Sequence, residues 1–155
     1  MNQQEILQAK KWDLNLLKRV DIPIEKGIYC YLNQVATSIE YVGSAVGLKG
    51  LRGRIWSQHL NPNYLENRSE KFSTKDKGQI QKNVIKRGKL VIEKSAFRKN
   101  VARQHDLTPG EPSVDFIKEN FLLVYFAVNL EKEKIHEIEK RMIRDLNPKY
   151  NIRKY

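Results

Sequence analysis

Three things are scarce in this sequence: cysteine, long apolar runs and acidic residues. Cys30 is the single cysteine, so an intramolecular disulfide is excluded and a reducing compartment is expected. No stretch approaches the ~20 apolar residues of a membrane-spanning helix. The first fifteen residues also lack the apolar core of a secretory signal. We therefore expect a cytoplasmic protein with no membrane partner.

The length of 155 residues fits one domain, because domains commonly run to ~100–200 residues. Hydrophobic residues make up 40% and charged residues 30%, which is ordinary for a globular protein and argues against disorder. No repeat or interdomain linker is visible. We predict a single domain over residues 1–155.

The shortage of acidic residues is local. Residues 49–103 contain fifteen lysines and arginines against four acidic residues, an excess that equals the net charge of +11 of the whole chain. Positive charge gathered in one region favours a polyanionic partner such as nucleic acid. A solubilising surface is the alternative, but it would not require the charge to be concentrated in one third of the chain.

Apolar periodicity and turn residues predict the secondary structure. We expect helices at 3–19, 49–60, 78–87, 95–104, 113–119 and 131–146, strands at 28–33, 38–42, 89–92 and 121–128, and a polar loop at 61–76. Ser95 is the expected N-cap of helix 95–104, and Thr108-Pro109-Gly110 the expected turn. The fold class is α/β (α+β): a small, mainly antiparallel sheet of the three strands 28–33, 38–42 and 121–128, flanked by helices.

Two tripeptides mark the strand pair. Gly27-Ile28-Tyr29 is followed by Tyr41-Val42-Gly43, and Tyr41 comes twelve residues after Tyr29. Strands joined by a tight loop would place these two hydroxyls side by side at one edge of the sheet. The next helix brings Arg54 and His59, a late helix carries Glu139, and Asn151 follows it.

This ordered set resembles the GIY-YIG nuclease superfamily. Each tripeptide alone occurs by chance, but the whole series over 27–151 is specific. Residues 1–26 and about 89–119 fall outside the shared core, as an N-terminal helical extension and a basic insertion. The resemblance implies a metal-dependent DNA endonuclease that leaves 5′-phosphate and 3′-hydroxyl ends, with a role in restriction, repair or a mobile element. It also implies the catalytic residues Tyr29, Tyr41, Arg54, His59, Glu139 and Asn151.

In that scheme Tyr29 aids activation of the attacking water, with His59 as a relay, and Tyr41 orients water or phosphate. Arg54 binds the scissile phosphate, a task that suits its planar guanidinium. Glu139 holds Mg²⁺ or Mn²⁺ beside the leaving 3′ oxygen, and Asn151 holds the local geometry.

Glu139 is also unusual without any resemblance. It lies within the apolar stripe that Ile135, Met142 and Ile143 form on the helix. A carboxylate there is costly unless a cation or hydrogen-bond donors meet it. A hard divalent ion is one partner that would do so. The alternative is a peripheral glutamate whose stem packs on the core edge or which pairs with an arginine.

Arg54 and His59 are five residues apart, whereas many superfamily members have four. On a regular helix of ~3.6 residues per turn, this spacing turns His59 away from Arg54. Either the helix is locally irregular, or Gln58 faces the site.

Segment 95–104 predicts an amphipathic helix with a cationic face that would contact phosphates without reading sequence. The candidate nucleic-acid-binding residues are Arg52, Lys75, Lys82, Lys86, Arg98, Lys99 and Arg103. Two alternatives stay open: a non-catalytic nucleic-acid-binding protein on the same scaffold, and an RNA-directed nuclease. Cutting both strands of a duplex would require a homodimer or sequential nicking, and recruitment by a larger partner is a further possibility.

Overall fold

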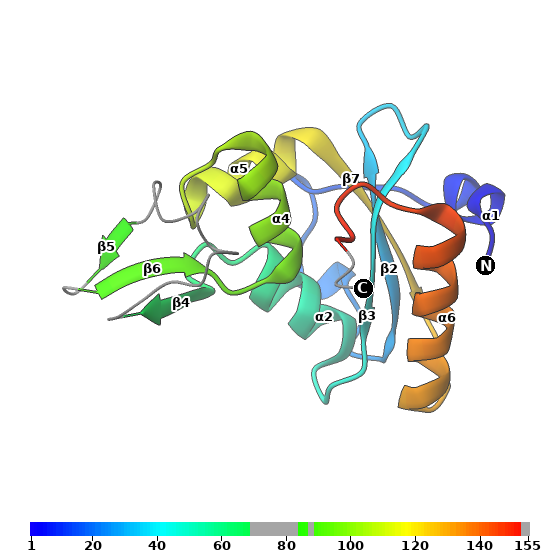
Figure 1. The fold of residues 1–155 in the computed structure, drawn as a ribbon. Coiled ribbons are helices and arrows are strands. Elements are labelled where there is room, and N and C mark those ends of the chain that lie inside the picture. Colours follow the sequence, from blue (N-terminus) through cyan, green and yellow to red (C-terminus); the bar gives the residue numbers. More distant parts are fainter. Residues whose placement is uncertain (69–83, 87–88, 153–155) are drawn as a thin grey trace. The chain divides into compact units, whose positions relative to one another are not determined.

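The computed structural model describes residues 1–68, 84–86 and 89–152 (Figure 1). The chain forms two compact units. The first comprises Met1–Trp56 and Lys118–Tyr155, and the second comprises Ser57–Ile117. The single nuclease domain over 1–155, with 1–26 as its extension and 89–119 as its insertion, stays a prediction. Among the described residues, no helix is both long and apolar enough to span a membrane.

An antiparallel sheet forms the centre of the first unit. Its strand order is β1 (Trp12–Asp13), β7 (Phe121–Ala127), β2 (Gly27–Asn33) and β3 (Ile39–Ala45). In its register, Tyr29 of β2 lies opposite Gly43 of β3 and Tyr125 of β7. The α/β class, the predicted strand pair and the inner position of 121–128 are confirmed. The short β1 adds a fourth strand to the three predicted.

Alternation along β2 divides the two faces of this sheet. Ile28, Cys30 and Leu32 point into a hydrophobic core with Ile135 and Met142 of α6 (Lys132–Leu146). Figure 1 shows α6 lying along the sheet, as predicted for residues 131–146. The tyrosines of β2 therefore belong to the opposite face.

The predicted helix 3–19 is wrong beyond its first turns. Helix α1 covers Gln3–Gln8 and ends at Ala9, whose backbone is extended. Trp12 then pairs with Leu123 of β7, so strand pairing overrides the local helical pattern. Leu14 and Leu17 are buried, as the pattern required. They lie between β1 and the short helix η1 (Arg19–Asp21) and not on one continuous helix.

The second unit contains a three-stranded antiparallel sheet that the sequence did not reveal. The order is β4 (Leu65–Arg68), β6 (Lys89–Glu93) and β5 (Val84–Lys86). The strand at 89–92 is confirmed. The predicted loop is wrong at 65–68 and the predicted helix is wrong at 84–86, because both segments pair with β6. The remaining parts of those two predictions, at 69–76, 78–83 and 87, lie outside the described residues.

Two helices complete this part of the chain. Helix α4 (Ala96–His105) begins at the predicted N-cap, where the Ser95 hydroxyl accepts a hydrogen bond from the Arg98 amide at 3.3 Å. Helix α5 (Glu111–Asn120) is longer than the turn predicted at 113–119. Between them Gly110 has a φ of +96°, the left-handed conformation that the predicted turn needs.

Candidate active site

Three tyrosines cluster on the sheet face opposite α6. Tyr29 is 2% exposed and its ring centroid lies 6.3 Å from that of the half-buried Tyr41, to which it is hydrogen-bonded. The ring centroid of Tyr31 lies 6.0 Å and 6.4 Å from those of Tyr29 and Tyr41, and Tyr31 is fully buried. The two predicted catalytic phenols are therefore neighbours.

The glycines of the two tripeptides have a steric explanation. A Cβ atom built on Gly43 would overlap the Cζ and hydroxyl oxygen of Tyr29, and would lie 2.8 Å from Cε2 of the same ring. A Cβ on Gly27 would overlap the carbonyl oxygen of Phe126 on the neighbouring strand. Gly43 therefore makes room for the Tyr29 phenol, and Gly27 lets β7 pair closely with β2.

Arg54 and Glu139 both act electrostatically on the tyrosine pair. Burial raises the pKa of Tyr29 well above its usual value, the other two phenols and Glu139 raise it further, and Arg54 lowers it. Burial, with a contribution from Glu139, raises the pKa of Tyr41 to about 12, against opposing effects from Arg54 and the Tyr29 hydrogen bond. Arg54 of α2 (Gly50–Arg54) and Glu139 of α6 thus both act electrostatically on the phenols of β2 and β3. At neutral pH both phenols are protonated donors.

Glu139 lies half-buried on α6, on the side of the helix that carries the buried Ile135 and Met142. Within the described residues, no group of three or more acidic, histidine or cysteine side chains could hold a metal ion. A site with one carboxylate suits Mg²⁺, which keeps several waters and binds through one or two carboxylates plus substrate phosphates. A cation there would also offset a negative charge held at the edge of the core. The donor set therefore fits a single hard divalent ion.

Asn151 contacts the strand that carries Tyr41. Its side-chain amide donates to the Val42 carbonyl at 2.9 Å, and its Oδ1 accepts from the Val42 amide at 2.8 Å. One residue earlier, the Tyr150 amide donates to the Glu40 carbonyl at 2.9 Å. These bonds hold the backbone on both sides of Tyr41, so Asn151 acts on the position of the phenol.

The helix that carries Arg54 is irregular. It is α-helical over Gly50–Arg54 and becomes a π-helix, η2, over Ile55–His59. In a π-turn the hydrogen bonds run from residue i to i+5, so residues five apart follow one another along the helix. This is the first of the two explanations offered for the five-residue spacing.

His59 itself belongs to the second unit, where it contacts Ser95 and Phe97. It is 3% exposed, its Nδ1 lies 2.9 Å from the Ser95 hydroxyl, and its ring packs edge-on against Phe97 with centroids 5.6 Å apart. Sequence analysis identified Ser95 only as a helix cap. Ser95 and His59 are 36 residues apart in the sequence, so no local signal pointed to the contact.

Arg98 corrects the predicted cationic face of segment 95–104. Its side chain is fully buried, forms an ion pair with Glu93 at 2.6 Å, and donates to the Gln58 and Asn61 carbonyls. It cannot contact a phosphate from this position. Burial raises the pKa of Glu93, with the Arg98 charge and hydrogen bonds from Gly110 and Ser113 opposing that shift.

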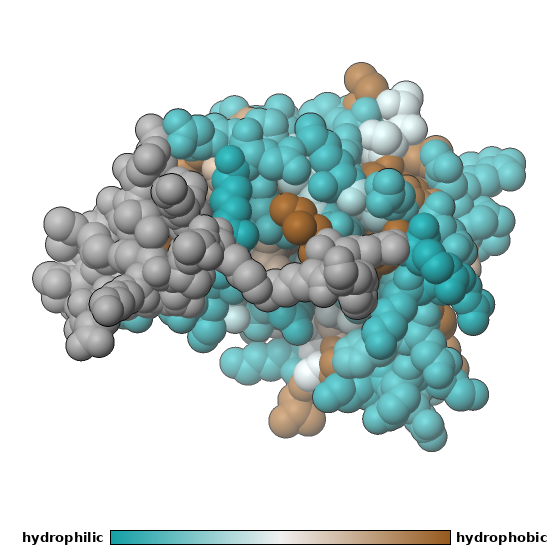
Figure 2. All heavy atoms as spheres, viewed as in Figure 1, coloured by the Kyte–Doolittle hydropathy of each residue, from teal (hydrophilic) through white to brown (hydrophobic). Residues whose placement is uncertain are grey.

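The other candidate nucleic-acid contacts differ in their surroundings. Arg52 Nε donates to the Ile22 carbonyl at 2.8 Å, and Lys99 and Arg103 are half-buried on α4. Lys86 is part of β5, whereas Lys75 and Lys82 lie outside the described residues. Where described residues form the face seen in Figure 2, that face is largely hydrophilic with scattered hydrophobic areas.

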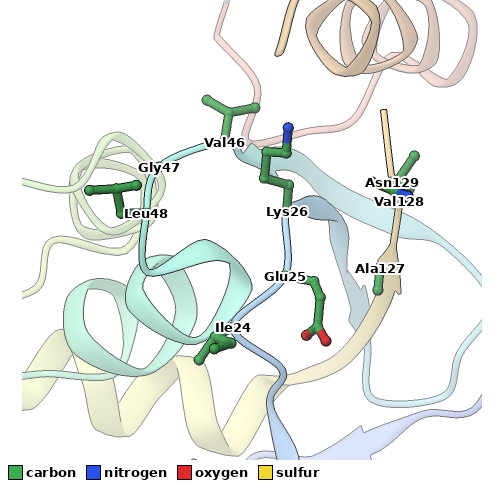
Figure 3. Close-up of a pocket in the computed structure, with 9 residues that line it drawn as sticks. All are labelled: Ile24, Glu25, Lys26, Val46, Gly47, Leu48, Ala127, Val128 and Asn129. Atoms are coloured by element: carbon green, nitrogen blue, oxygen red, sulfur yellow. The ribbon is translucent and has the colours of Figure 1, made fainter. Parts of the chain in front are cut away.

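A pocket of about 540 Å³ lies at the ends of the strands, away from the tyrosine pair. Figure 3 shows it between the segments before β2, after β3 and after β7. It is lined by Ile24, Glu25, Lys26, Val46, Gly47, Leu48, Ala127, Val128 and Asn129. Its walls are mainly aliphatic and do not include the candidate catalytic residues.

Comparison with known proteins gives no matching family model and no matching curated protein. Two solved structures are similar to the chain. Both are the GIY-YIG N-terminal endonuclease domain of UvrC from Thermotoga maritima, as two different tyrosine-to-phenylalanine variants bound to the catalytic divalent cation. In each case the identity is 20%, the similarity covers 97% of this chain and 93% of the other, and the TM-score is 0.43.

Proposed function

We propose that this protein is a GIY-YIG-type endonuclease that hydrolyses phosphodiester bonds with the help of a divalent metal ion. The observation that carries the proposal is the cluster around Tyr29 and Tyr41, on which Arg54 and Glu139 exert opposite electrostatic effects. A cation and a carboxylate beside two neutral hydroxyl donors match the needs of a phosphate that is being attacked.

Hydrolysis requires three things of such a site: a deprotonated water, charge stabilisation on the transition state, and a stabilised leaving oxygen. Arg54 is exposed at the end of α2. We assign its guanidinium to the scissile phosphate, which it would bind as a bidentate donor. The two phenols donate hydrogen bonds that orient the attacking water and the phosphate. Because their raised pKa values keep the phenols protonated at neutral pH, we assign them the role of donors and not that of proton acceptor.

Glu139 would hold the metal ion, and Asn151 positions Tyr41 through its bonds to Val42. When bound, Mg²⁺ or Mn²⁺ supplies positive charge for the oxygens of the phosphate and for the leaving 3′ oxygen. The products of this reaction are a 5′-phosphate and a 3′-hydroxyl.

The proposed substrate is DNA. The net charge of +11, concentrated between residues 49 and 103, supports a polyanion, and the resemblance to the superfamily favours DNA over RNA. We propose a role in restriction, repair or a mobile element. The main alternative is a protein that binds nucleic acid without cleaving it. Such a protein would gain nothing from a half-buried carboxylate that acts on the buried Tyr29 phenol and the half-buried Tyr41 phenol.

The test is cleavage of supercoiled plasmid in Mg²⁺, in Mn²⁺ and in EDTA. The variant is Glu139→Gln, which keeps the shape and removes the charge. Its matched control is Glu137→Gln, which makes the same change at an exposed position two residues away on α6. We expect relaxed or linear product from the wild type and Glu137→Gln in metal. Glu139→Gln should lose about 10²-fold or more in rate, the scale seen when one stabilising group is removed.

Equal cutting by the wild type and Glu139→Gln would refute the assignment of the site. Salt-dependent binding of plasmid without cleavage in either metal would favour the non-catalytic alternative. A structured RNA of similar length, run in parallel, decides between DNA and RNA as substrate.

A further inference from the structure

Trp12 and Tyr125 form an aromatic pair on the sheet face that also carries the tyrosine cluster. Tyr125 lies directly opposite Tyr29 in the register, so the two side chains share a face. The Trp12 ring stacks on Tyr125, with centroids 5.8 Å apart and an angle of 15° between the planes. All three residues belong to the first unit. We name Trp12 and Tyr125 the aromatic platform.

The register joins the platform to the tyrosine cluster. One row of paired residues crosses the four strands from β1 to β3: Trp12, Leu123, Tyr31 and Tyr41. The two middle residues of the row are fully buried, whereas the two end residues are half-buried. Because neighbouring strands lie ~4.8 Å apart, the two ends are separated by about 14 Å. One bound strand of nucleic acid is long enough to contact both ends.

Exposed basic side chains accompany the platform. The Lys10 ammonium lies over the Trp12 ring, 3.9 Å from its centroid, and Lys10 is exposed, so this surface of the ring is open to solvent. Segment 10–19 contains four basic residues against one acidic residue. Two of the basic residues, Lys18 and Arg19, are also exposed. Phosphates on either side of a stacked base would meet this positive charge.

Hydrogen bonds hold the platform and the neighbouring turn in place. The Asn15 side chain donates to the Lys118 carbonyl at 3.3 Å, and the Tyr125 hydroxyl donates to the Asp21 carbonyl at 2.5 Å. The Asp21 carboxylate accepts from the Lys18 amide at 2.8 Å. The rings and the nearby charges are therefore arranged before a ligand binds, which lowers the cost of ordering them.

An aromatic platform beside basic residues suits a nucleic-acid base. Bases stack on aromatic side chains with little dependence on sequence, because every base has a π face. A base inside a duplex is covered by its neighbours, so only an unpaired base can offer that face. Base stacking is stronger than an exposed cation–π contact, so a base would displace the Lys10 ammonium from the Trp12 ring. The displaced ammonium would then lie close to the phosphate of the same nucleotide.

We propose that Trp12, supported by Tyr125, stacks on an unpaired base of a DNA strand, and that Lys10 contacts the adjacent phosphate. This inference rests on the proposed function and narrows its substrate to DNA with an unpaired base near the cut. A stacked strand rises ~3.4 Å per nucleotide, so the separation of about 14 Å places that base about four nucleotides from the scissile phosphate. The N-terminal segment thereby takes part in substrate binding.

The first test compares DNA binding by the full chain in EDTA, measured by fluorescence anisotropy. The probes are a labelled single strand, a fully paired duplex, and the same duplex with one unpaired base. Trp12→Leu keeps an apolar side chain but lacks the flat ring. Its binding to the single strand and to the duplex with the unpaired base should weaken about tenfold, with the paired duplex unaffected. Trp12→Phe keeps a ring and should bind all three probes within about threefold of the wild type.

Tryptophan fluorescence reports the contact directly. The chain has two tryptophans, so Trp12→Phe leaves Trp56 alone. Saturating single strand should quench the emission of the wild type more strongly than that of Trp12→Phe, because a stacked base quenches the indole.

The phosphate contact has its own matched pair of variants. Lys10→Gln should reduce the slope of log K against log salt by about 0.7, the value for one phosphate of a single strand. Lys134→Gln makes the same change at an exposed position on α6, which covers the other face of the sheet, and should leave the slope unchanged.

Equal quenching in the wild type and in Trp12→Phe would overturn the proposal, as would wild-type affinity in Trp12→Leu. If Trp12→Leu fails to fold, the comparison of the wild type with Trp12→Phe still decides. Stronger binding of an RNA strand of the same sequence would overturn the assignment to DNA. Plasmid cleavage without quenching at Trp12 refutes this inference alone, whereas quenching at Trp12 without cleavage in Mg²⁺ or Mn²⁺ refutes the proposed function alone.

Discussion

Replacing Gly43 with alanine should displace the Tyr29 ring. The new methyl group would overlap Cζ and the hydroxyl oxygen, and Tyr29 is 2% exposed with Tyr31 and Tyr41 packed around it. The ring therefore has little room to move away. Overpacking of this kind costs about 1–3 kcal/mol. With a urea slope of ~1–3 kcal/mol per M, the unfolding midpoint should fall by about 1 M.

Gly47→Ala is the matched control, because a Cβ atom there meets nothing within 4 Å. Its free energy of unfolding should change by less than ~0.5 kcal/mol. Urea unfolding followed by far-UV circular dichroism measures both variants, and plasmid cleavage should fall in Gly43→Ala alone. Equal midpoints for the two variants would refute the steric explanation of the second tripeptide.

Three further predictions concern stability, measured by urea unfolding. Asn151→Ala loses both bonds to Val42 and should lower the free energy of unfolding by about 1–3 kcal/mol, at ~1 kcal/mol per hydrogen bond, with slower cleavage. Arg98→Met leaves a buried carboxylate without its counter-charge and should cost about 3–5 kcal/mol, whereas Arg144→Met, at an exposed pair, should cost under about 1 kcal/mol. Burial raises the pKa of Cys30 to about 12, so the folded thiol stays protonated while the unfolded one ionises above about pH 8.5. The free energy of unfolding should therefore fall as pH rises through that window, and Cys30→Ala should remove this part of the slope.

Local patterns predicted the elements whose partners are close in sequence or whose apolar stripe is long. The hairpin of β2 and β3 and the helix α6 belong to this class. The short strands β1, β4 and β5 do not, because each is defined by pairing with a distant segment. Val84, Ile85 and Lys86 also fit the helical pattern of residues 78–87, and their pairing with β6 makes them a strand.

The candidate site was also predictable only in part, because some of its contacts depend on distant partners. Tyrosine, arginine and glutamate in a fixed order predicted residues that the structure joins electrostatically. Arg98 was misjudged because its partner Glu93 lies five positions earlier, on a strand rather than on the same helix. A basic residue in the sequence is therefore not always on the surface, because a buried carboxylate can form an ion pair with it, as Glu93 does with Arg98.

The hydrogen bonds at Glu40 and Val42 also affect whether a strand of another chain can pair with β3. Strand β3 is the last strand of its sheet, a position where unpaired amides and carbonyls invite another strand to add. The Tyr150 amide and the Asn151 side chain occupy three of those groups. A foreign strand would have to displace them, so the same contacts that steady the sheet also protect it against edge-to-edge aggregation.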